Sequence, residues 1–99
     1  MGILRYVEPE EITDTDALIA LINAEKGARS WSTKRLSEES GIPLGTLNRR
    51  LGNEPRSIKM AETAKLAAAF NMATSEFIAA AEDRRLKMQA EANEKAARG

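Results

Sequence analysis

Residues 32–51 place single large apolar residues at helical spacing among polar ones. Leu36 is the only large apolar residue of the first half, whereas Leu47 and Leu51, four positions apart, form an apolar stripe in the second. A glycine, an isoleucine and a proline stand between the halves at 41–43, where glycine tolerates the left-handed backbone that ends a helix and proline presets the next φ. The pattern predicts two short helices joined by a tight turn, which is a helix-turn-helix.

The segment before this motif predicts one amphipathic helix. Thr13 can cap its start, and two aspartates follow at the positive end of the helix dipole. Its apolar stripe consists of Ala17, Leu18, Leu21 and Ile22. We expect Gly27 to end this helix and Trp31 to anchor the core just before Ser32, the expected cap of the next helix.

Two further helices are expected after the motif and a loop at 52–56. Ser57 would cap a helix that runs to about Phe70, and Thr74 would cap the next. The positions expected to be buried are Met60, Ala64, Leu66, Ala67 and Phe70 in the first helix, and Phe77, Ile78 and Ala81 in the second. A hydrophobic ligand pocket at Met60, Phe70 and Met72 is the alternative to core packing, which the helical period favours.

The two ends of the chain differ in composition from residues 13–81, which we expect to form the domain. Residues 1–12 contain a strand-like run, one arginine and three glutamates, so they could pack on the domain, pair with a second copy or stay loose. Residues 82–99 form a charged tail with high helix propensity and a thin apolar stripe. We expect the last helix to continue to about Met88, against a second copy, and to fray beyond it.

The net charge is zero but unevenly distributed along the chain. Residues 1–26 carry two basic and six acidic side chains, residues 27–59 carry seven and three, and residues 60–99 carry six of each. The positive excess therefore coincides with the motif, as binding to a phosphate backbone would favour. Chance clustering on a solvated surface is the alternative interpretation.

Several kinds of chemistry are excluded by composition. The chain has no cysteine and no histidine, which excludes disulfides, thiolate catalysis, zinc fingers and imidazole-dependent sites. Neither carboxylates paired over a cleft nor a glycine-rich phosphate loop is evident. We therefore expect no catalytic residue, metal site or cofactor, and no enzyme. No stretch has the length or apolarity to cross a membrane.

Three motifs follow one another in a fixed order. Residues 18–27 carry the apolar pattern of a first helix, and residues 36–47 carry Leu-Ser-x-x-Ser-Gly-Ile-Pro-x-x-Thr-Leu. Residues 66–78 carry the apolar pattern of a fourth and a fifth helix. Together they resemble the Cro and lambda-repressor (Xre-like) family of helix-turn-helix transcriptional regulators, over roughly residues 15–80. The resemblance implies an all-α, compact five-helix lambda-repressor-like domain that binds double-stranded operator DNA, usually as a homodimer. It also implies the bacterial cytoplasm, or that of the host cell for a phage protein.

The second helix of such a motif lies in the major groove. At about 100° per residue, Leu47 and Leu51 face inward and Gly45 and Arg49 face outward. The expected base contacts are Arg49 to guanine, Asn48 to adenine, Thr46, Gly45 through its backbone, and Leu44 to a thymine methyl group. Partial burial of Leu44 is an equal alternative.

Phosphate contacts are expected from the start of the motif and from the basic residues around it. Thr33 and Lys34 match the end of the family's second helix that anchors a phosphate. The full set of expected phosphate contacts is Ser32, Thr33, Lys34, Arg35, Arg50, Asn53, Arg56 and Lys59.

The favoured function is a small sequence-specific transcriptional regulator, similar to a phage Cro protein or an immunity repressor. The alternative is an antitoxin or protein-interaction module that binds a partner protein through its acidic N-terminal face or its C-terminal helix. Asn48, Arg49 and Arg50 would have little purpose in a pure adaptor. If the protein is a dimer, the C-terminal helix is the expected contact surface.

Overall fold

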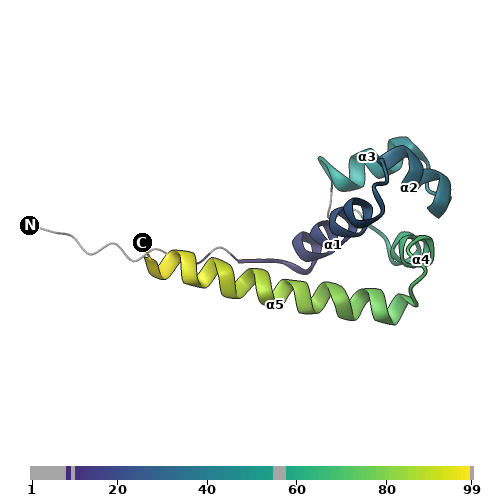
Figure 1. Ribbon diagram of the computed structural model, residues 1–99. Helices are drawn as coiled ribbons and strands as arrows, with labels where there is room; N and C mark the ends of the chain where they lie inside the picture. The colour runs from purple at the N-terminus through teal and green to yellow at the C-terminus, as the bar shows by residue number, and fades with distance from the viewer. Residues whose placement is uncertain (1–8, 10, 55–57, 99) are drawn as a thin grey trace, which may run out of the picture.

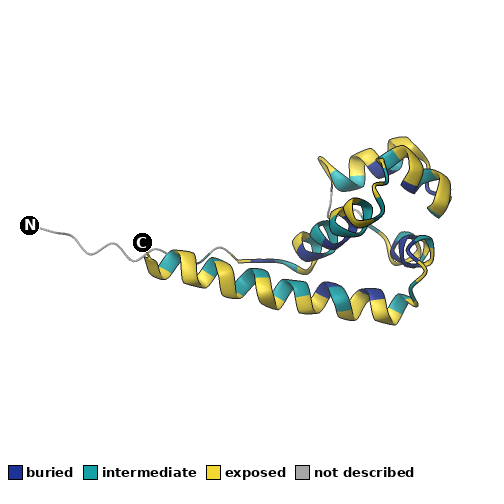
Figure 2. Ribbon diagram, viewed as in Figure 1, coloured by how far each residue is buried: buried dark blue, intermediate teal, exposed yellow. Residues whose placement is uncertain are grey.

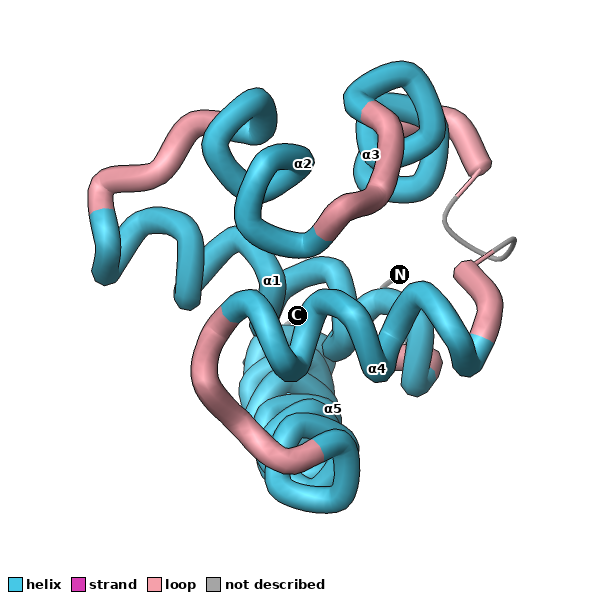
Figure 3. Tube along the Cα trace, turned by 90° about the vertical axis from the view of Figure 1, so that its right-hand side faces the viewer, coloured by secondary structure: helices cyan, strands magenta, loops and turns pink. Residues whose placement is uncertain are grey.

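The computed structural model describes residue 9 and residues 11–54 and 58–98 of the chain. Within that part the protein forms five α-helices: α1 (Asp14–Arg29), α2 (Thr33–Ser40), α3 (Leu44–Leu51), α4 (Met60–Ala69) and α5 (Thr74–Arg98). α2 and α3 lie together on one side of α1 and α4, and α5 runs beneath on the other side (Figures 1 and 3). The described residues are therefore all-α, and the helix-turn-helix lies opposite the longest helix.

α1 begins where the sequence predicts, but it ends later than expected. The Thr13 hydroxyl accepts a hydrogen bond from the Asp16 amide at 3.1 Å, and the Asp16 carboxylate accepts one from the Thr13 amide at 3.1 Å. Gly27, the expected end, instead lies inside the last turn of α1. The helix ends at Ser30, which adopts a left-handed φ of 55°. The helix thus runs two residues past Gly27, and the Arg29 guanidinium at this end donates to the carbonyl oxygen of Phe70 at 2.9 Å.

The starts of α4 and α5 also differ from the sequence-based expectation. α4 begins at Met60, and the expected cap, Ser57, lies outside the described residues. Thr74 is the first residue of α5 rather than its cap. Ala73 takes the cap position without a hydroxyl, and its own amide donates to the Glu76 carboxylate at 3.2 Å, which is the half of a capping box that needs no hydroxyl.

The core lies where α1, α2, α3, α4 and α5 meet. Its largest fully buried side chains are Ile22, Leu36, Leu47, Leu66, Phe70 and Phe77. Trp31 stacks on Phe70 with ring centroids 5.8 Å apart, and Phe70 lies 6.0 Å from Phe77. Figure 2 shows these buried positions turned inward, whereas the outer faces of the helices are exposed. The expected core role of Trp31 is confirmed, since it packs against this cluster.

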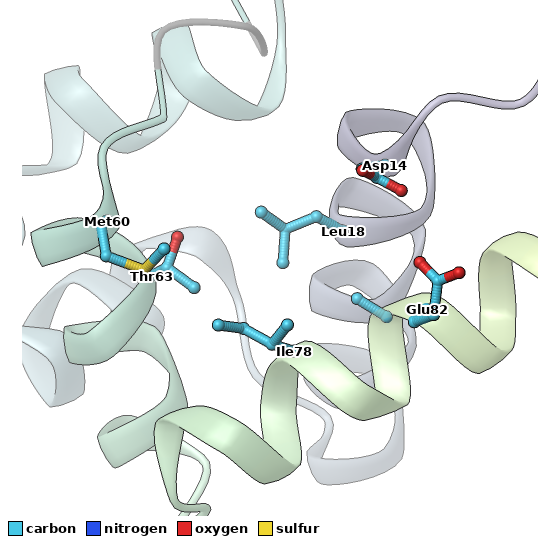
Figure 4. A pocket seen from close by; sticks show the side chains of 7 residues that line it. Asp14, Leu18, Met60, Thr63, Ile78 and Glu82 are labelled. Atoms are coloured by element: carbon cyan, nitrogen blue, oxygen red, sulfur yellow. The ribbon is translucent and has the colours of Figure 1, made fainter.

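Two residues expected in the core are exposed. Met60 is 67% exposed and Ile78 is 43% exposed. With Leu18 they line a hollow of about 200 Å³ between α1, α4 and α5, and their side chains point toward its open centre (Figure 4). Local periodicity placed them on the inner faces of their helices, but the neighbouring helices do not cover those positions. The alternative pocket at Met60, Phe70 and Met72 does not form, since Phe70 and Met72 pack in or against the core, away from exposed Met60.

α5 continues as one helix past the position where we expected it to fray. It runs from Thr74 to Arg98, about 37 Å at the usual rise per residue. Arg85 pairs with Asp14 at 3.2 Å, and the side-chain oxygen of Gln89 accepts a hydrogen bond from the Ile12 amide at 2.9 Å. Contacts with α1 and the residues before it therefore accompany the helix beyond the domain limit expected at residue 81. The strand-like run near the N-terminus lies outside the described residues.

In the parts of the chain that the structure describes, no helix combines the length and the apolar character that crossing a bilayer requires.

Candidate nucleic-acid interface

The helix-turn-helix expected at residues 32–51 is formed by α2 and α3, and its turn is fixed by local hydrogen bonds. Gly41 ends α2 with a φ of 75°, a conformation that other residues adopt only at a cost. The Ser37 hydroxyl donates to the carbonyl oxygen of Ile42 at 2.6 Å, and the Ile42 amide donates to the Ser40 hydroxyl at 3.2 Å. Since Ile42 is also buried, the turn sets the direction in which α3 leaves α2.

The outer face of α3 gathers the polar residues expected to contact bases. Asn48 and Arg49 are exposed, whereas Leu47 is buried on the opposite face. One terminal guanidinium nitrogen of Arg49 lies 3.5 Å from the Thr46 hydroxyl, and the other lies 4.0 Å from the place where a Cβ on Gly45 would stand. A guanidinium, a hydroxyl, an amide and a bare stretch of backbone therefore share one exposed face of the helix.

Leu44, at the start of α3, is 38% exposed and so lies between the two alternatives considered for it. It is not part of the buried core, which Leu51 reaches only by packing against its edge. An exposed methyl-rich side chain at this position could contact a thymine methyl group, so that contact stays a prediction.

The start of α2 gathers four of the groups that suit a phosphate. The Ser32 hydroxyl caps the helix by accepting from the Arg35 amide at 3.0 Å, and Lys34 is exposed in the first turn. Lys26, from the last turn of α1, donates to the Thr33 hydroxyl at 2.8 Å. Two ammonium groups, two hydroxyls and the positive end of a helix dipole therefore belong to this part of the surface, as anion binding favours.

Arg50, an expected phosphate contact, is paired with two carboxylates of the domain. Its Nε donates to the Glu62 carboxylate at 3.0 Å, and its terminal nitrogen lies 3.7 Å from Glu54. Its side chain is only 13% exposed, so the guanidinium is turned into the domain toward two carboxylates. Burial alone would raise the pKa of Glu62, but hydrogen bonds from the Lys59 amide and from Arg50, together with the charges of Arg50 and Lys59, lower this pKa below its ordinary value.

The remaining expected phosphate contacts differ in their exposure and in their charged partners. Arg35 is exposed but pairs with Glu39 at 2.9 Å, and its guanidinium lies 5.5 Å from the Trp31 ring centroid. Asn53 and Lys59 are exposed on either side of the loop between α3 and α4. Arg56 lies outside the described residues. Arg35 therefore brings a partly neutralised charge to this surface, and the exposed charge of Lys59 lies near Glu62.

The comparison with known protein families identifies this arrangement. The model of the Cro/C1-type helix-turn-helix DNA-binding domain matches residues 26–83, more than half of the chain. The chain belongs to this family. No curated protein matches it, and no solved structure does.

This Cro/C1-type protein is thus a helix-turn-helix DNA-binding protein of the regulator type, as its sequence predicted. The matched range begins at Lys26 in the last turn of α1 and ends within α5. It contains α2, α3 and α4 in full, so DNA is the partner that the family match supports. The family is a DNA-binding one rather than a family of enzymes.

Two residues near the interface escaped the sequence analysis. Lys26 was counted with the acidic residues 1–26. The short link from α1 to α2 could have indicated that the last turn of α1, which contains Lys26, lies beside Thr33. Glu62 was counted only as one of the six acids of residues 60–99. Its contact with Arg50, twelve residues earlier, leaves no local signal in the sequence.

Proposed function

We propose that this protein is a sequence-specific transcriptional regulator that places α3 in the major groove of double-stranded operator DNA. The observation that carries the proposal is the exposed face of α3, where Arg49 lies over Gly45 and Thr46 and is preceded by exposed Asn48. A guanidinium can bond both acceptors of a guanine edge, and an amide can do so with adenine. Gly45 lets the backbone come close, and Leu44 adds an apolar contact.

The phosphate contacts in this proposal begin at the start of α2, where Lys26 joins Ser32, Thr33 and Lys34. A phosphate there would receive both backbone amides and an ammonium group. Arg35, Asn53, Arg56 and Lys59 are the further phosphate contacts that we propose. Arg50 is left out, because its charge is engaged by Glu62 and Glu54.

Control in this proposal comes from binding and release of operator DNA, as in a phage Cro protein or an immunity repressor acting in the cytoplasm. One module of this size covers few base pairs. Two copies on a palindromic site would therefore supply the affinity that one copy lacks.

A selection from a random duplex library tests the proposal. We expect one sequence family to be enriched, with half-sites about one helical turn apart for a dimer. Binding to the winner should weaken steeply with salt, and Lys26→Met should reduce the salt slope by about one. Arg84→Met on α5 is the matched control and should leave the slope unchanged. Failure to enrich any duplex would contradict the proposal.

A second candidate function, binding of a partner protein, rests on the hollow between α1, α4 and α5. Met60 and Ile78 are unusually exposed there, and the carboxylates of Asp14 and Glu82 lie at one rim (Figure 4). Such an apolar floor suits the apolar face of an amphipathic segment, since the two carboxylates at its rim are already paired with Arg85. If no duplex is enriched, this candidate replaces DNA reading, and Ile78→Asp would then be expected to abolish capture of the partner.

A further inference from the structure

α3 is held in the domain by few apolar anchors. Leu47 is its one buried residue, and Leu51 packs only against the edge of the core. The helix packs chiefly against α2, which is equally short. Its attachment to α4, across the loop that contains Asn53, therefore depends on polar contacts.

The strongest described polar contact between α3 and α4 runs through a single oxygen atom of Glu62. That oxygen accepts a hydrogen bond from the Arg50 Nε at 3.0 Å and another from the Lys59 amide at 3.0 Å. Arg50 belongs to the last turn of α3, and Lys59 directly precedes α4. The Glu62 carboxylate thus joins the last turn of α3 to the start of α4.

Burial distinguishes this pair from an ordinary surface ion pair. The side chains of Arg50 and Glu62 are 13% and 16% exposed, whereas Glu54, the second partner of Arg50, is 53% exposed. A pair that is largely shielded from water keeps its geometry better than an exposed one, and removal of one partner leaves the other poorly solvated. The lowered pKa of Glu62 is consistent with this attachment.

We propose that Glu62 is a positioning residue for DNA reading. It does not touch the nucleic acid; through Arg50 it fixes the angle at which α3 presents Asn48 and Arg49 to the groove. This inference rests on the proposed function of α3. It assigns an acidic residue a favourable role beside a surface that binds a polyanion.

The proposal predicts a change in DNA affinity opposite to the one that a simple charge effect would give. If Glu62 acted only as a negative charge near DNA, its removal would strengthen binding to every duplex alike. If it positions α3, its removal weakens binding to the selected duplex while binding to a scrambled duplex holds or strengthens. The ratio of the two affinities therefore separates the two roles.

The test is a double-mutant cycle on the full chain. Glu62→Gln, Arg50→Met and the double variant are titrated with the selected duplex and with a scrambled duplex of the same composition, at two salt concentrations. Urea unfolding of each variant establishes that the protein is folded at the titration temperature.

Glu54→Gln is the charge control, because it removes an exposed acid near the same arginine. Glu76→Gln is the capping control, because Glu76 binds the Ala73 amide at the far end of the domain.

We expect each single variant to lose about five- to tenfold in affinity for the selected duplex only, and the double variant to lose no more than one of them. The salt slope should stay unchanged, and both controls should keep the discrimination of the original protein. If Glu62→Gln and Glu54→Gln both raise the affinity for the two duplexes equally, Glu62 acts only through its charge, and the proposal is overturned. Equal weakening on both duplexes for Arg50→Met, with a salt slope lower by about one, would make Arg50 a phosphate contact and also overturn it. If the unchanged protein does not discriminate between the duplexes, the proposed function itself fails.

Discussion

α2 and α3 bury one leucine each, whereas α1 and α4 bury three residues each and α5 adds Phe77 and Ala81. We refer to residues 32–51 as the recognition unit and to α1, α4 and α5 as the scaffold. In the recognition unit the outer face of α3 is left to exposed polar groups. In the scaffold several acids and bases pair with one another, as Arg85 does with Asp14 and Glu82.

This difference separates stability from recognition. Most of the apolar surface that folding buries belongs to the scaffold and to the two leucines that tie the recognition unit to it. The polar face of α3 contributes little to that core. Truncation of buried scaffold side chains should therefore act chiefly on unfolding, and removal of the polar side chains on the outer face of α3 should act chiefly on DNA binding.

Truncation of a core side chain of the scaffold should have the largest effect. Phe77 is fully buried and contacts Phe70, so Phe77→Ala should reduce the free energy of unfolding by about 3–5 kcal/mol. Leu44→Ala, on the exposed start of α3, should cost less than about 0.5 kcal/mol. Urea unfolding followed by circular dichroism measures both. Equal costs for the two variants would contradict the division between scaffold and recognition unit.

Two glycine substitutions should change stability in opposite directions. A Cβ on Gly41 or on Gly27 would meet no atom within 4 Å, but Gly41 has a φ of 75° and Gly27 lies within a helix. Gly41→Ala should cost about 1–2 kcal/mol through backbone strain in the turn of the recognition unit. Gly27→Ala should stabilise the protein by about 0.5–1 kcal/mol, because alanine favours the helix of the scaffold. Thermal unfolding of the two variants measures the difference, and a stabilised Gly41→Ala protein would show that the turn is not under this constraint.

Gly45→Ala should separate stability from recognition at a single position. The added Cβ would meet only the Arg49 guanidinium, at 4.0 Å, so the helix should gain about 0.5–1 kcal/mol of stability. If the backbone at Gly45 approaches DNA, affinity for the selected duplex should fall at the same time. Anisotropy titration beside urea unfolding gives both numbers. A variant that is both more stable and equally tight in binding would remove Gly45 from the DNA surface.

The pH dependence of the link between α3 and α4 should be the smallest effect. The pKa of Glu62 is lowered in the folded protein, so its contribution to stability is present above the ordinary glutamate pKa and is lost as the pH falls through the lowered value. The original protein should exceed Glu62→Gln in stability by about 1 kcal/mol or less near pH 7, and this advantage should shrink below about pH 4. Urea unfolding across this range measures it. An advantage that grows in acid would contradict the lowered pKa.

The sequence predicted what local chemistry determines. Ser32 caps α2 and Gly41 ends it in a left-handed conformation, because each acts on backbone groups within a few residues. Arg49 and Asn48 were placed on the outer face of α3 from the helical period alone. The recognition unit was therefore largely predictable.

What escaped prediction depends on contacts between distant segments. Gly27 was expected to end α1, but the helix continues to Arg29, which bonds to Phe70, 41 residues later. Met60 and Ile78 are apolar at core-like spacing, and only the packing of neighbouring helices decides that they stay exposed. Arg50 was expected to reach a phosphate, and nothing near it in the sequence indicates that Glu62 would bind its side chain.

The central claim, that the outer face of α3 reads the bases while the scaffold supports it, is tested most directly by one pair of variants. Asn48→Ala/Arg49→Ala and Asn93→Ala/Arg98→Ala remove the same residue types, the first from α3 and the second from the far end of α5. The measurement is the ratio of affinities for the selected and scrambled duplexes, beside the free energy of unfolding. We expect the first variant to lose about 1–3 kcal/mol of discrimination for each base contact removed, with stability unchanged within about 0.5 kcal/mol, and the second to match the original protein. Equal discrimination by both variants would contradict the claim.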